Sequence, residues 1–253
     1  MSKVIVVTGA SRGIGLAISH YLLQHSHKVT LVARSEAPLR DLEGQYPDQT
    51  AILTGDLADL SLGQKAINLT IQTFGKLDGV IVNHGTLDPV SRVADSSAEA
   101  WRNAYNINFF SAVALATAAI PHLRSTTGTI LFTSSGAAAT AYPTWGAYGS
   151  SKAALNHLAQ SIAAEEKEAG VTSMAIRPGV VDTEMQREIR EKHHEVMEES
   201  DRKRFKELKD TGALLRPEQP GWVMAKLVLE APRELSGKFL SWNAEELKAF
   251  QEG

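Results

Sequence analysis

Short runs of β-branched and other apolar residues recur along the chain, and turn residues bound each run. Several runs are apolar at consecutive positions, which is typical of strands that are buried on both faces of a parallel sheet. On this basis seven strands are predicted, over residues 4–7, 29–33, 51–53, 79–82, 128–133, 172–176 and 238–240.

The segments between these strands carry apolar residues at helical spacing. In residues 15–25 the spacing puts Leu16, Ser19 and Leu23 on one side, and residues 62–74 follow a similar pattern. Strands that alternate with helices predict an α/β fold with a doubly wound parallel sheet and helices on both of its faces. No repeat and no linker-like tract divides the sequence, so residues 1–253 are predicted to form a single domain.

Composition narrows the possible functions. The 253 residues carry a formal net charge of -3, which gives no basic surface for nucleic acid. The absence of cysteine excludes disulfides and thiolate ligands, and we predict no metal site. The apolar run 4–7 is too short for a signal peptide, and we expect no other stretch to reach the ~20 apolar residues of a membrane span. The expectation is a soluble cytoplasmic protein that binds neither nucleic acid nor membrane.

A glycine-rich turn follows the first predicted strand and precedes a predicted helix. Its sequence is Thr8-Gly9-Ala10-Ser11-Arg12-Gly13-Ile14-Gly15. Backbone N–H groups in such a turn can approach a phosphate, and the start of the helix favours its negative charge. The spacing differs from the usual Gly-x-Gly-x-x-Gly fingerprint, and a glycine turn without a ligand is the alternative. Its position directly after the first strand favours nucleotide binding.

The end of the second predicted strand bears on which nucleotide binds. An acidic residue there would bind the ribose 2′-OH of NAD, whereas an arginine suits the 2′-phosphate of NADP. Ala33 stands at that place and Arg34 follows it, while Arg12 could reach the same phosphate. We therefore predict NADP(H) as the cofactor. The alternative is that Arg34 is an ordinary solvated arginine, and the nearby Glu36 weighs against the phosphate.

Tyr148 and Lys152 are four residues apart in a predicted helix, which places both side chains on one face. A neighbouring ammonium favours the phenolate and lowers the pKa of a tyrosine from its usual ~10. Such a phenol can pass a proton to a developing alkoxide or accept one from an alcohol. The spacing alone is common by chance, so its meaning depends on the other motifs.

In their order along the chain, these motifs resemble those of the short-chain dehydrogenase/reductase family. The resemblance runs from Val4 to about Leu240 and rests on segments 8–15, 56–57, 82–85, 101–108, 133–135, 148–152 and 177–183. It implies a Rossmann-type fold and transfer of a hydride between a nicotinamide cofactor and a carbonyl or alcohol. Within the family, the run Trp145-Gly146-Ala147-Tyr148 and the segment 34–39 resemble the sepiapterin reductase and benzil reductase branch.

The resemblance also implies a role for each site residue. Tyr148 would donate the proton, Lys152 would assist it and bind the nicotinamide ribose, Ser135 would hold the substrate oxygen, and Asn108 would hold a relay water. Ser134 and Asn106 are the competing choices. The implied cofactor contacts are Gly9, Ser11, Arg12, Gly13, Ile14, Gly15, Arg34, Ser35, Asp56, Leu57, Asn83, Gly85, Tyr148, Lys152, Pro178, Gly179, Val181 and Thr183.

The sequence departs from the family pattern after the fourth strand, where Val82 replaces an asparagine and His84 replaces an alanine. His84 is interpreted as packing beside the cofactor instead of acting as a general acid. The C-terminal segment 238–243 also departs from the pattern, which leaves the oligomeric state open. We expect a homo-oligomer, a dimer or tetramer, formed through the helix 111–119 and the helix after Tyr148.

Substrate predictions rest on the segment between Ser135 and Tyr148, which lines the pocket in this family. Tyr142 and Trp145 would form aromatic walls for a flat apolar ligand, although they could instead pack a subunit surface. The branch resemblance implies NADPH-dependent reduction of a small-molecule carbonyl, with an α-diketone such as benzil as the best choice. Quinones, pteridines, other ketones and a non-catalytic NADP(H) sensor are the alternatives, and a nucleotide-sugar epimerase lacks room for its C-terminal domain.

Residues 184–210 are crowded with charges of both signs. The family places a substrate cover after Thr183, so this segment is predicted to be a mobile helical lid. Met185, and with it Ile189, would face the pocket. His193 and His194 are adjacent and cannot share a helix face, so they are not interpreted as a metal pair.

Overall fold

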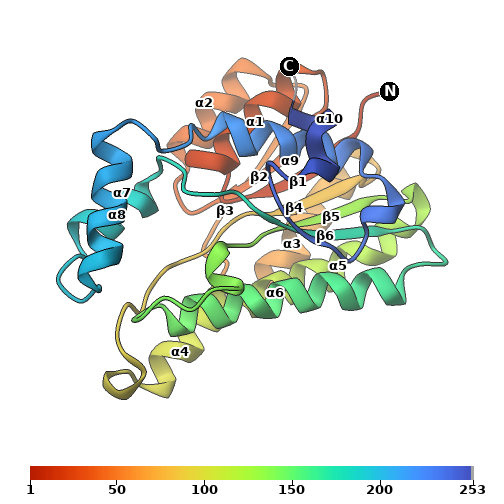
Figure 1. Cartoon of the computed structure of the whole chain (residues 1–253). Coiled ribbons are helices and arrows are strands. Elements are labelled where there is room, and N and C mark those ends of the chain that lie inside the picture. Colours follow the sequence, from red (N-terminus) through yellow and green to blue (C-terminus); the bar gives the residue numbers. More distant parts are fainter. Residues whose placement is uncertain (252–253) are drawn as a thin grey trace.

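The computed structural model describes residues 1–251 and contains one sheet of parallel strands (Figure 1). The strand order is β3-β2-β1-β4-β5-β6-β7. The strands are β1 (Val4–Thr8), β2 (Lys28–Ala33), β3 (Thr50–Thr54), β4 (Gly79–Val82), β5 (Thr129–Thr133), β6 (Thr172–Arg177) and β7 (Phe239–Ser241). The doubly wound Rossmann-type fold is confirmed, and every predicted strand lies within two residues of its observed bounds.

Helices cover both faces of the sheet (Figure 1). One face is covered by α1 (Gly13–Gln24), α2 (Ala37–Gln45), α9 (Glu218–Glu230) and α10 (Lys248–Gln251). The other is covered by α3 (Ser61–Phe74), α5 (Ser111–Thr126) and α6 (Gly146–Glu165), with α4 (Ala98–Tyr105) before α5. The helices α7 (Glu184–Glu191) and α8 (Glu199–Asp210) project beyond these layers.

The alternating side chains of each strand divide the core in two. In β1, Ile5 and Val7 belong to the apolar cluster under α1, α2 and α9, whereas Val6 belongs to the cluster under α3, α5 and α6. In β5, Leu131 and Phe132 divide in the same way, and all five of these side chains are fully buried. Burial of one such side chain stabilises the fold by about 1.5–3 kcal/mol. Because both faces are covered, the strands must be apolar at consecutive positions.

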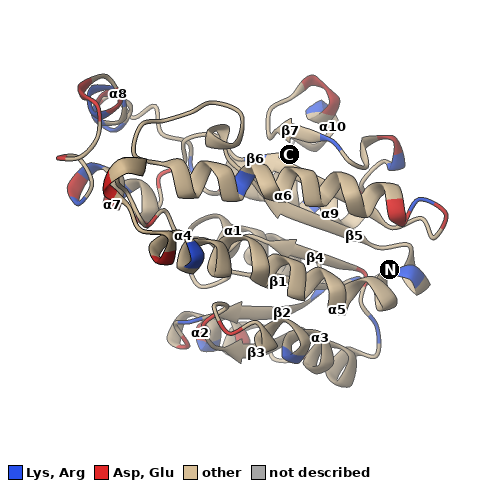
Figure 2. Ribbon diagram, turned by 90° about the horizontal axis from the view of Figure 1, so that it is seen from below, with Lys and Arg blue, Asp and Glu red and all other residues tan. Residues whose placement is uncertain are grey.

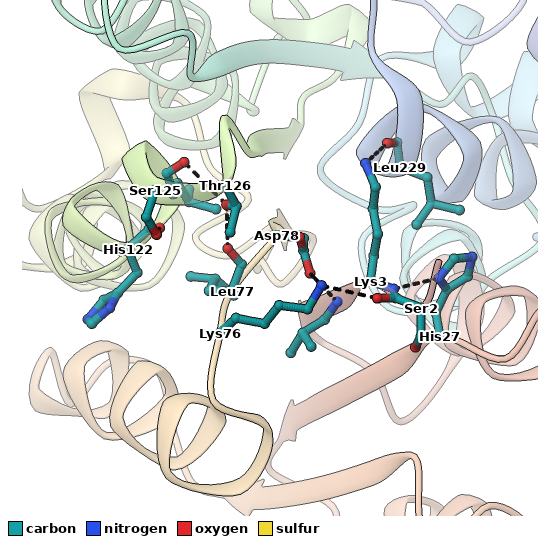
Figure 3. Close-up of polar contacts among 12 residues, drawn as sticks. Ser2, Lys3, His27, Lys76, Leu77, Asp78, His122, Ser125, Thr126 and Leu229 are labelled. Carbon is teal, nitrogen blue, oxygen red and sulfur yellow. Dashed lines mark hydrogen bonds and ion pairs between the residues drawn. The ribbon is translucent and has the colours of Figure 1, made fainter.

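The amino ends of the strands are closed by a network of polar contacts (Figure 3). Asp78 Oδ2 accepts a hydrogen bond of 2.8 Å from the backbone N–H of Val4 and pairs with Lys76 Nζ at 2.9 Å. Close by, Lys3 N donates to His27 Nδ1 at 3.1 Å, and Thr126 Oγ1 donates to Leu77 O at 2.7 Å. These contacts fasten the chain between elements, and the candidate catalytic side chains lie at the opposite, carboxyl ends of the strands.

The helical run Ala98–Thr126 is long and apolar enough, by length and composition alone, to cross a membrane. The expectation that no such stretch exists is therefore wrong in that respect. In the fold, 44% of its apolar window is buried and α5 packs against α3, which identifies it as a core helix.

Candidate active site

The turn between β1 and α1 requires glycine at several positions, because other residues there would be strained or would clash with the backbone. Gly9 and Gly13 have φ angles of 66° and 55°, in the left-handed region that favours glycine. A Cβ on Gly15 would lie 2.2 Å from the carbonyl oxygen of Gly9. The turn leads directly into the first residue of α1, so its N–H groups and the helix dipole form a candidate phosphate-binding site.

Asn83 supports this turn from the end of β4. Its backbone N–H donates to Thr8 Oγ1 at 3.0 Å, and its side-chain oxygen accepts from Thr133 Oγ1 at 3.1 Å. A Cβ on Gly9 or Gly15 would lie 3.1 or 2.7 Å from Asn83 Nδ2. Asn83 thus links the ends of β1, β4 and β5 beneath the candidate phosphate-binding site.

Arg34 and Ser35 are exposed just after β2, where the 2′-phosphate was predicted. Glu36 had weighed against that prediction, but its carboxylate pairs with Arg40 Nε at 2.9 Å. Within the described part of the chain, Arg34 makes no salt bridge. A guanidinium without an acidic partner is therefore available to an anion at this point.

Other predicted cofactor residues lie around the same end of the sheet. Asp56 is exposed, and its Oδ1 accepts a hydrogen bond of 2.9 Å from Ala58 N, whereas Leu57 is buried. After β6, Pro178 and Val181 are buried, and Gly179 has a φ angle of 80°.

Thr183 links the glycine turn to the lid. Its side chain caps α7 by accepting a hydrogen bond from Gln186 N. Its Cγ2 lies only 3.1 Å from the position of a Cβ on Gly13. One residue therefore contacts both the phosphate turn and the first turn of α7.

Tyr148 and Lys152 lie on one face of α6, and both are buried. Lys152 Nζ lies 5.8 Å from the centre of the Tyr148 ring and donates a hydrogen bond of 2.8 Å to the carbonyl oxygen of Thr133. Burial lowers the pKa of Lys152 to about 8. The helix thus presents a phenol beside a lysine that loses its proton as the pH rises through about 8.

The pKa of Tyr148 is raised, contrary to the expectation that Lys152 brings it below the usual value. Burial raises the pKa of the phenol, and only a hydrogen bond with Ser135 acts in the opposite direction. Removal from water penalises the phenolate, while the ammonium is engaged by Thr133 instead of the phenol oxygen.

The structure separates the two serine candidates at the end of β5. Ser134 is buried, and its hydroxyl donates to Asn156 Oδ1 at 2.6 Å. Ser135 is the one that interacts with the Tyr148 phenol, and it also accepts a hydrogen bond from Ala137 N at 3.1 Å. Ser135 is therefore the serine placed beside the candidate proton donor.

Asn108 lies in a π-helical turn, Asn106–Phe110, between α4 and α5. Its Oδ1 accepts from Thr86 N at 2.8 Å, and its Nδ2 donates to Thr86 O at 2.9 Å and to Ser151 Oγ at 3.1 Å. Gly85 leaves the space that these groups need, since a Cβ there would lie 3.2 Å from Asn108 Oδ1 and 3.4 Å from Lys152 Nζ. Asn108, not Asn106, thus belongs to the polar network beside Lys152.

Packed aromatic side chains, the aromatic wall, run from the start of α6 to α8 of the predicted lid. Trp145 is 6% exposed, and its ring lies 6.0 Å from that of Tyr148, edge to face. On its other sides it contacts Tyr142 at 5.0 Å and stacks on Phe205 of α8 at 5.7 Å and 13°. Met185 joins the same apolar cluster, as Leu87, Ile189 and Met197 also do. Phe205 was not predicted, because an isolated phenylalanine in a charged helix gives no sign of its partner.

The predicted lid consists of α7, α8 and the turn between them. Polar contacts tie it to the rest of the site: Arg92 pairs with Glu198 at 2.5 Å, Arg204 donates to the Tyr142 hydroxyl at 3.0 Å, and Lys209 pairs with Asp182 at 2.8 Å. His193 lies 3.6 Å from Asp88. Among residues 1–251, neither this histidine nor any other forms a cluster that could hold a metal ion.

These observations define a class. A doubly wound parallel sheet carries a glycine-rich turn after its first strand, and half-buried Ser135, just after β5, lies next to the buried Tyr148 and Lys152 of α6. This is the architecture of a nucleotide-dependent oxidoreductase. Residues 3–194 match the family model of the short chain dehydrogenases, and the chain belongs to that family.

Its similarity to individual relatives extends over the whole length. An uncharacterized oxidoreductase of Saccharomyces cerevisiae is 42% identical over 99% of each chain, and a crystal structure of this short chain dehydrogenase/reductase superposes with a TM-score of 0.96. A benzil reductase of the same yeast, which forms (S)-benzoin, is 41% identical over 99% of this chain and 100% of its own. The resemblance to the benzil reductase branch is confirmed.

Proposed function

We propose that this oxidoreductase is an NADPH-dependent carbonyl reductase that acts on one carbonyl of an α-diketone such as benzil and releases a hydroxyketone. The observation that carries the proposal is the buried Tyr148 phenol, with the Ser135 side chain beside it and Lys152 Nζ 5.8 Å from the centre of its ring. When bound, NADPH supplies the hydride.

The protein's own residues manage the proton. Ser135 positions the substrate oxygen beside the phenol, and Tyr148 donates its proton to that oxygen as charge develops on it. The raised pKa of Tyr148 keeps the phenol protonated at neutral pH, which suits reduction. The Lys152 ammonium beside the ring offsets part of the burial penalty on the tyrosinate that remains. The network of Asn108 with Thr86 and Ser151 lies next to Lys152 and would offer a route for a replacement proton.

Support for NADP(H) comes from the glycine turn and from the guanidinium of Arg34, which lies at the end of β2 and makes no salt bridge to a described residue. Gly9, Gly13 and Gly15 would hold the phosphates with the start of α1, and Arg34 with Ser35 and Arg12 would hold the 2′-phosphate. The further contacts are proposed at Ser11, Ile14, Asp56, Leu57, Asn83, Gly85, Lys152, Pro178, Gly179, Val181 and Thr183.

The substrate proposal rests on the aromatic wall and on relatives. Tyr142, Trp145 and Phe205 form a packed aromatic cluster next to the proposed proton donor, and such a cluster suits a pocket for the ring of a diaryl diketone. Two relatives named benzil reductases, from Saccharomyces cerevisiae and Bacillus cereus, are 41% and 34% identical. Met185 and the rest of the lid, residues 184–210, are proposed to close over the bound ketone.

The test is NADPH consumption by the purified protein with benzil, a small aliphatic diketone, a quinone, a pteridine and a monoketone. We expect the highest kcat/KM with benzil and formation of a single hydroxyketone enantiomer on a chiral column. No turnover of any carbonyl, together with tight NADPH binding, would instead support the alternative function of an NADP(H) sensor.

We further propose that the protein is cytoplasmic and forms a homo-oligomer. Few charged residues lie along α5 and α6, whereas α7 and α8 are densely charged (Figure 2). In the part of α6 before its last residue, Lys152 is the single charged residue, and it is buried. A second copy of the chain would cover this weakly charged surface.

A further inference from the structure

His84 makes contacts that its place in the family pattern does not explain. Its ring reaches three partners on other elements: Nδ1 lies 2.8 Å from Thr8 Oγ1, and Nε2 lies 2.7 Å from Ser111 Oγ and 3.1 Å from the carbonyl oxygen of Ile107. These partners belong to β1, to the start of α5 and to the π-helical turn before it. A single side chain therefore joins three elements at the carboxyl end of the sheet.

The π-helical turn explains why such a partner is needed. The N–H of Ser111 bonds to the carbonyl of Asn106, five residues earlier, instead of to that of Ile107. The carbonyl of Ile107 accepts instead from the Ser111 hydroxyl at 2.6 Å and lies 3.1 Å from His84 Nε2. Local changes of helical register of this kind occur frequently at functional sites. Here side chains take over the bonds that a regular helix would make.

The hydrogen on the ring can be assigned from these partners. A carbonyl oxygen only accepts, so the contact to Ile107 requires the hydrogen on Nε2. Nδ1 then accepts from the Thr8 hydroxyl at 2.8 Å, in place of the longer bond of 3.2 Å that this hydroxyl can donate to the Ile81 carbonyl. Burial, together with the nearby charge of Lys152, lowers the pKa of His84 to about 3, and the smaller effects of Ile107 and Asp56 act in the opposite direction. The ring is therefore neutral throughout the physiological range and keeps this arrangement.

The carbonyl that His84 holds belongs to the peptide linking Ile107 to Asn108. Two residues further along the loop, Thr86 N and O make two hydrogen bonds to the Asn108 side chain. Gly85, between them, leaves room for Asn108 Oδ1 and Lys152 Nζ. The loop after β4 thus contacts the π-helical turn at two points. His84 contacts the backbone carbonyl of Ile107, and Thr86 bonds to the side chain of Asn108.

We infer that His84 is a positioning residue, which fixes the π-helical turn through Ile107 and Ser111 so that Asn108 keeps its place in the network beside Lys152. This inference rests on the proposed reductase function for its kinetic consequence, but not for its structural part. His84 does not exchange a proton with the substrate, and its contribution is made through Asn108.

Matched variants distinguish the contributions of the two nitrogens of the His84 ring. A glutamine amide reaches about as far as Nε2, and an asparagine amide about as far as Nδ1. His84→Gln should therefore preserve the contact to Ile107 and retain most of the kcat, whereas His84→Asn and His84→Ala should lose roughly tenfold in kcat or more. In these two variants the alkaline limb of the pH profile of kcat should also shift, because Asn108 no longer holds its place beside Lys152.

Hydrogen exchange gives a measurement that needs no turnover. Amide exchange in residues 105–112 should be faster in His84→Asn than in His84→Gln, with equal exchange in α9 as the internal control. Equal exchange in the two variants, or a lowered melting temperature with an unchanged pH profile in His84→Asn, would overturn the positioning role. If the wild-type protein reduces no carbonyl, the proposed function fails, while the exchange data still decide whether His84 holds the turn.

Discussion

At the scale of single residues, burial sets the protonation state of the proposed proton donor. The Tyr148 phenol has a raised pKa because it is removed from water, so it remains a proton donor over the whole neutral range. Oxidation of an alcohol needs the opposite form, the phenolate. Burial therefore favours carbonyl reduction near neutral pH, and the reverse reaction should require alkaline conditions.

Tyr148→Phe removes the proposed proton donor and keeps the ring that contacts Trp145. We expect kcat for benzil reduction to fall by about 10²–10⁴, the usual range for general acid catalysis. Binding of NADPH, measured by the fluorescence of the cofactor, should stay within a factor of about two. Turnover near the wild-type level would show that another group donates the proton.

The lowered pKa of Lys152, about 8, predicts a pH dependence. Below this value the side chain is a charged ammonium that stabilises the tyrosinate, and above it the side chain is a neutral amine. The kcat for reduction should therefore fall as the pH rises through 8. Lys152→Arg keeps its charge in this range and should lack this limb in a pH–rate profile, at whatever reduced rate it retains. The same limb in both proteins would assign it to another group.

Arg34→Ala should weaken NADPH binding by roughly ten- to a hundredfold, because a charged hydrogen bond to the 2′-phosphate contributes about 1.5–3 kcal/mol. NADH binding should not change. Arg102→Ala is the control, since Arg102 is an exposed arginine of α4. Titration of both variants with both cofactors provides the measurement. Equal losses for NADPH and NADH would contradict the 2′-phosphate assignment.

Some site residues could be predicted from the sequence because they lie at fixed offsets from strands. Ser135 directly follows β5, and Tyr148 lies thirteen residues later near the start of α6, so their proximity depends on one strand and one helix. His84 and Phe205 could not be interpreted in this way. His84 lies 27 residues from Ser111, and Phe205 lies 60 residues from Trp145. The contacts depend on a π-helical turn and on the packing of α8, which leave no periodic pattern.

At the scale of elements, the strands were predictable because both faces of the sheet are covered, so each strand is a continuous apolar run. The lid is different. Its helices α7 and α8 are correctly predicted as helical, but their position depends on a few contacts such as Trp145 with Phe205 and Arg92 with Glu198. Charge patterns indicate a solvated face and do not indicate which ions pair across the site.

Phe205→Ala tests the part of α8 in the aromatic wall. Loss of the stack on Trp145 should lower kcat/KM for benzil roughly two- to tenfold, since such aromatic pairs contribute about 0.5–1.5 kcal/mol beyond the burial of their area. A small aliphatic diketone, too short to span the wall, should be reduced as before. Lys206→Ala, the next and exposed position of α8, is the control. An equal loss for both diketones would indicate a general effect on the lid.

At the scale of the whole molecule, the weakly charged surface of α5 and α6 predicts self-association (Figure 2). Val113 is a half-buried residue of α5, and Phe110, just before it, is 43% exposed. Val113→Arg should shift the sedimentation of the protein toward the monomer, because a charge would have to be buried between copies. A charge reversal on α8, such as Lys203→Glu, should not. A wild-type monomer at micromolar concentration would contradict the proposal.

The position of Thr183 has a consequence for the sequence of events in turnover. This residue caps α7 and touches the glycine turn, so occupation of the turn and placement of the first lid helix are mechanically linked. A lid that closes over the ketone would also block the access of the cofactor to the glycine turn after β1. The cofactor should therefore bind first and leave last, and product inhibition should follow a compulsory-order pattern in which NADP+ competes with NADPH while the hydroxyketone does not.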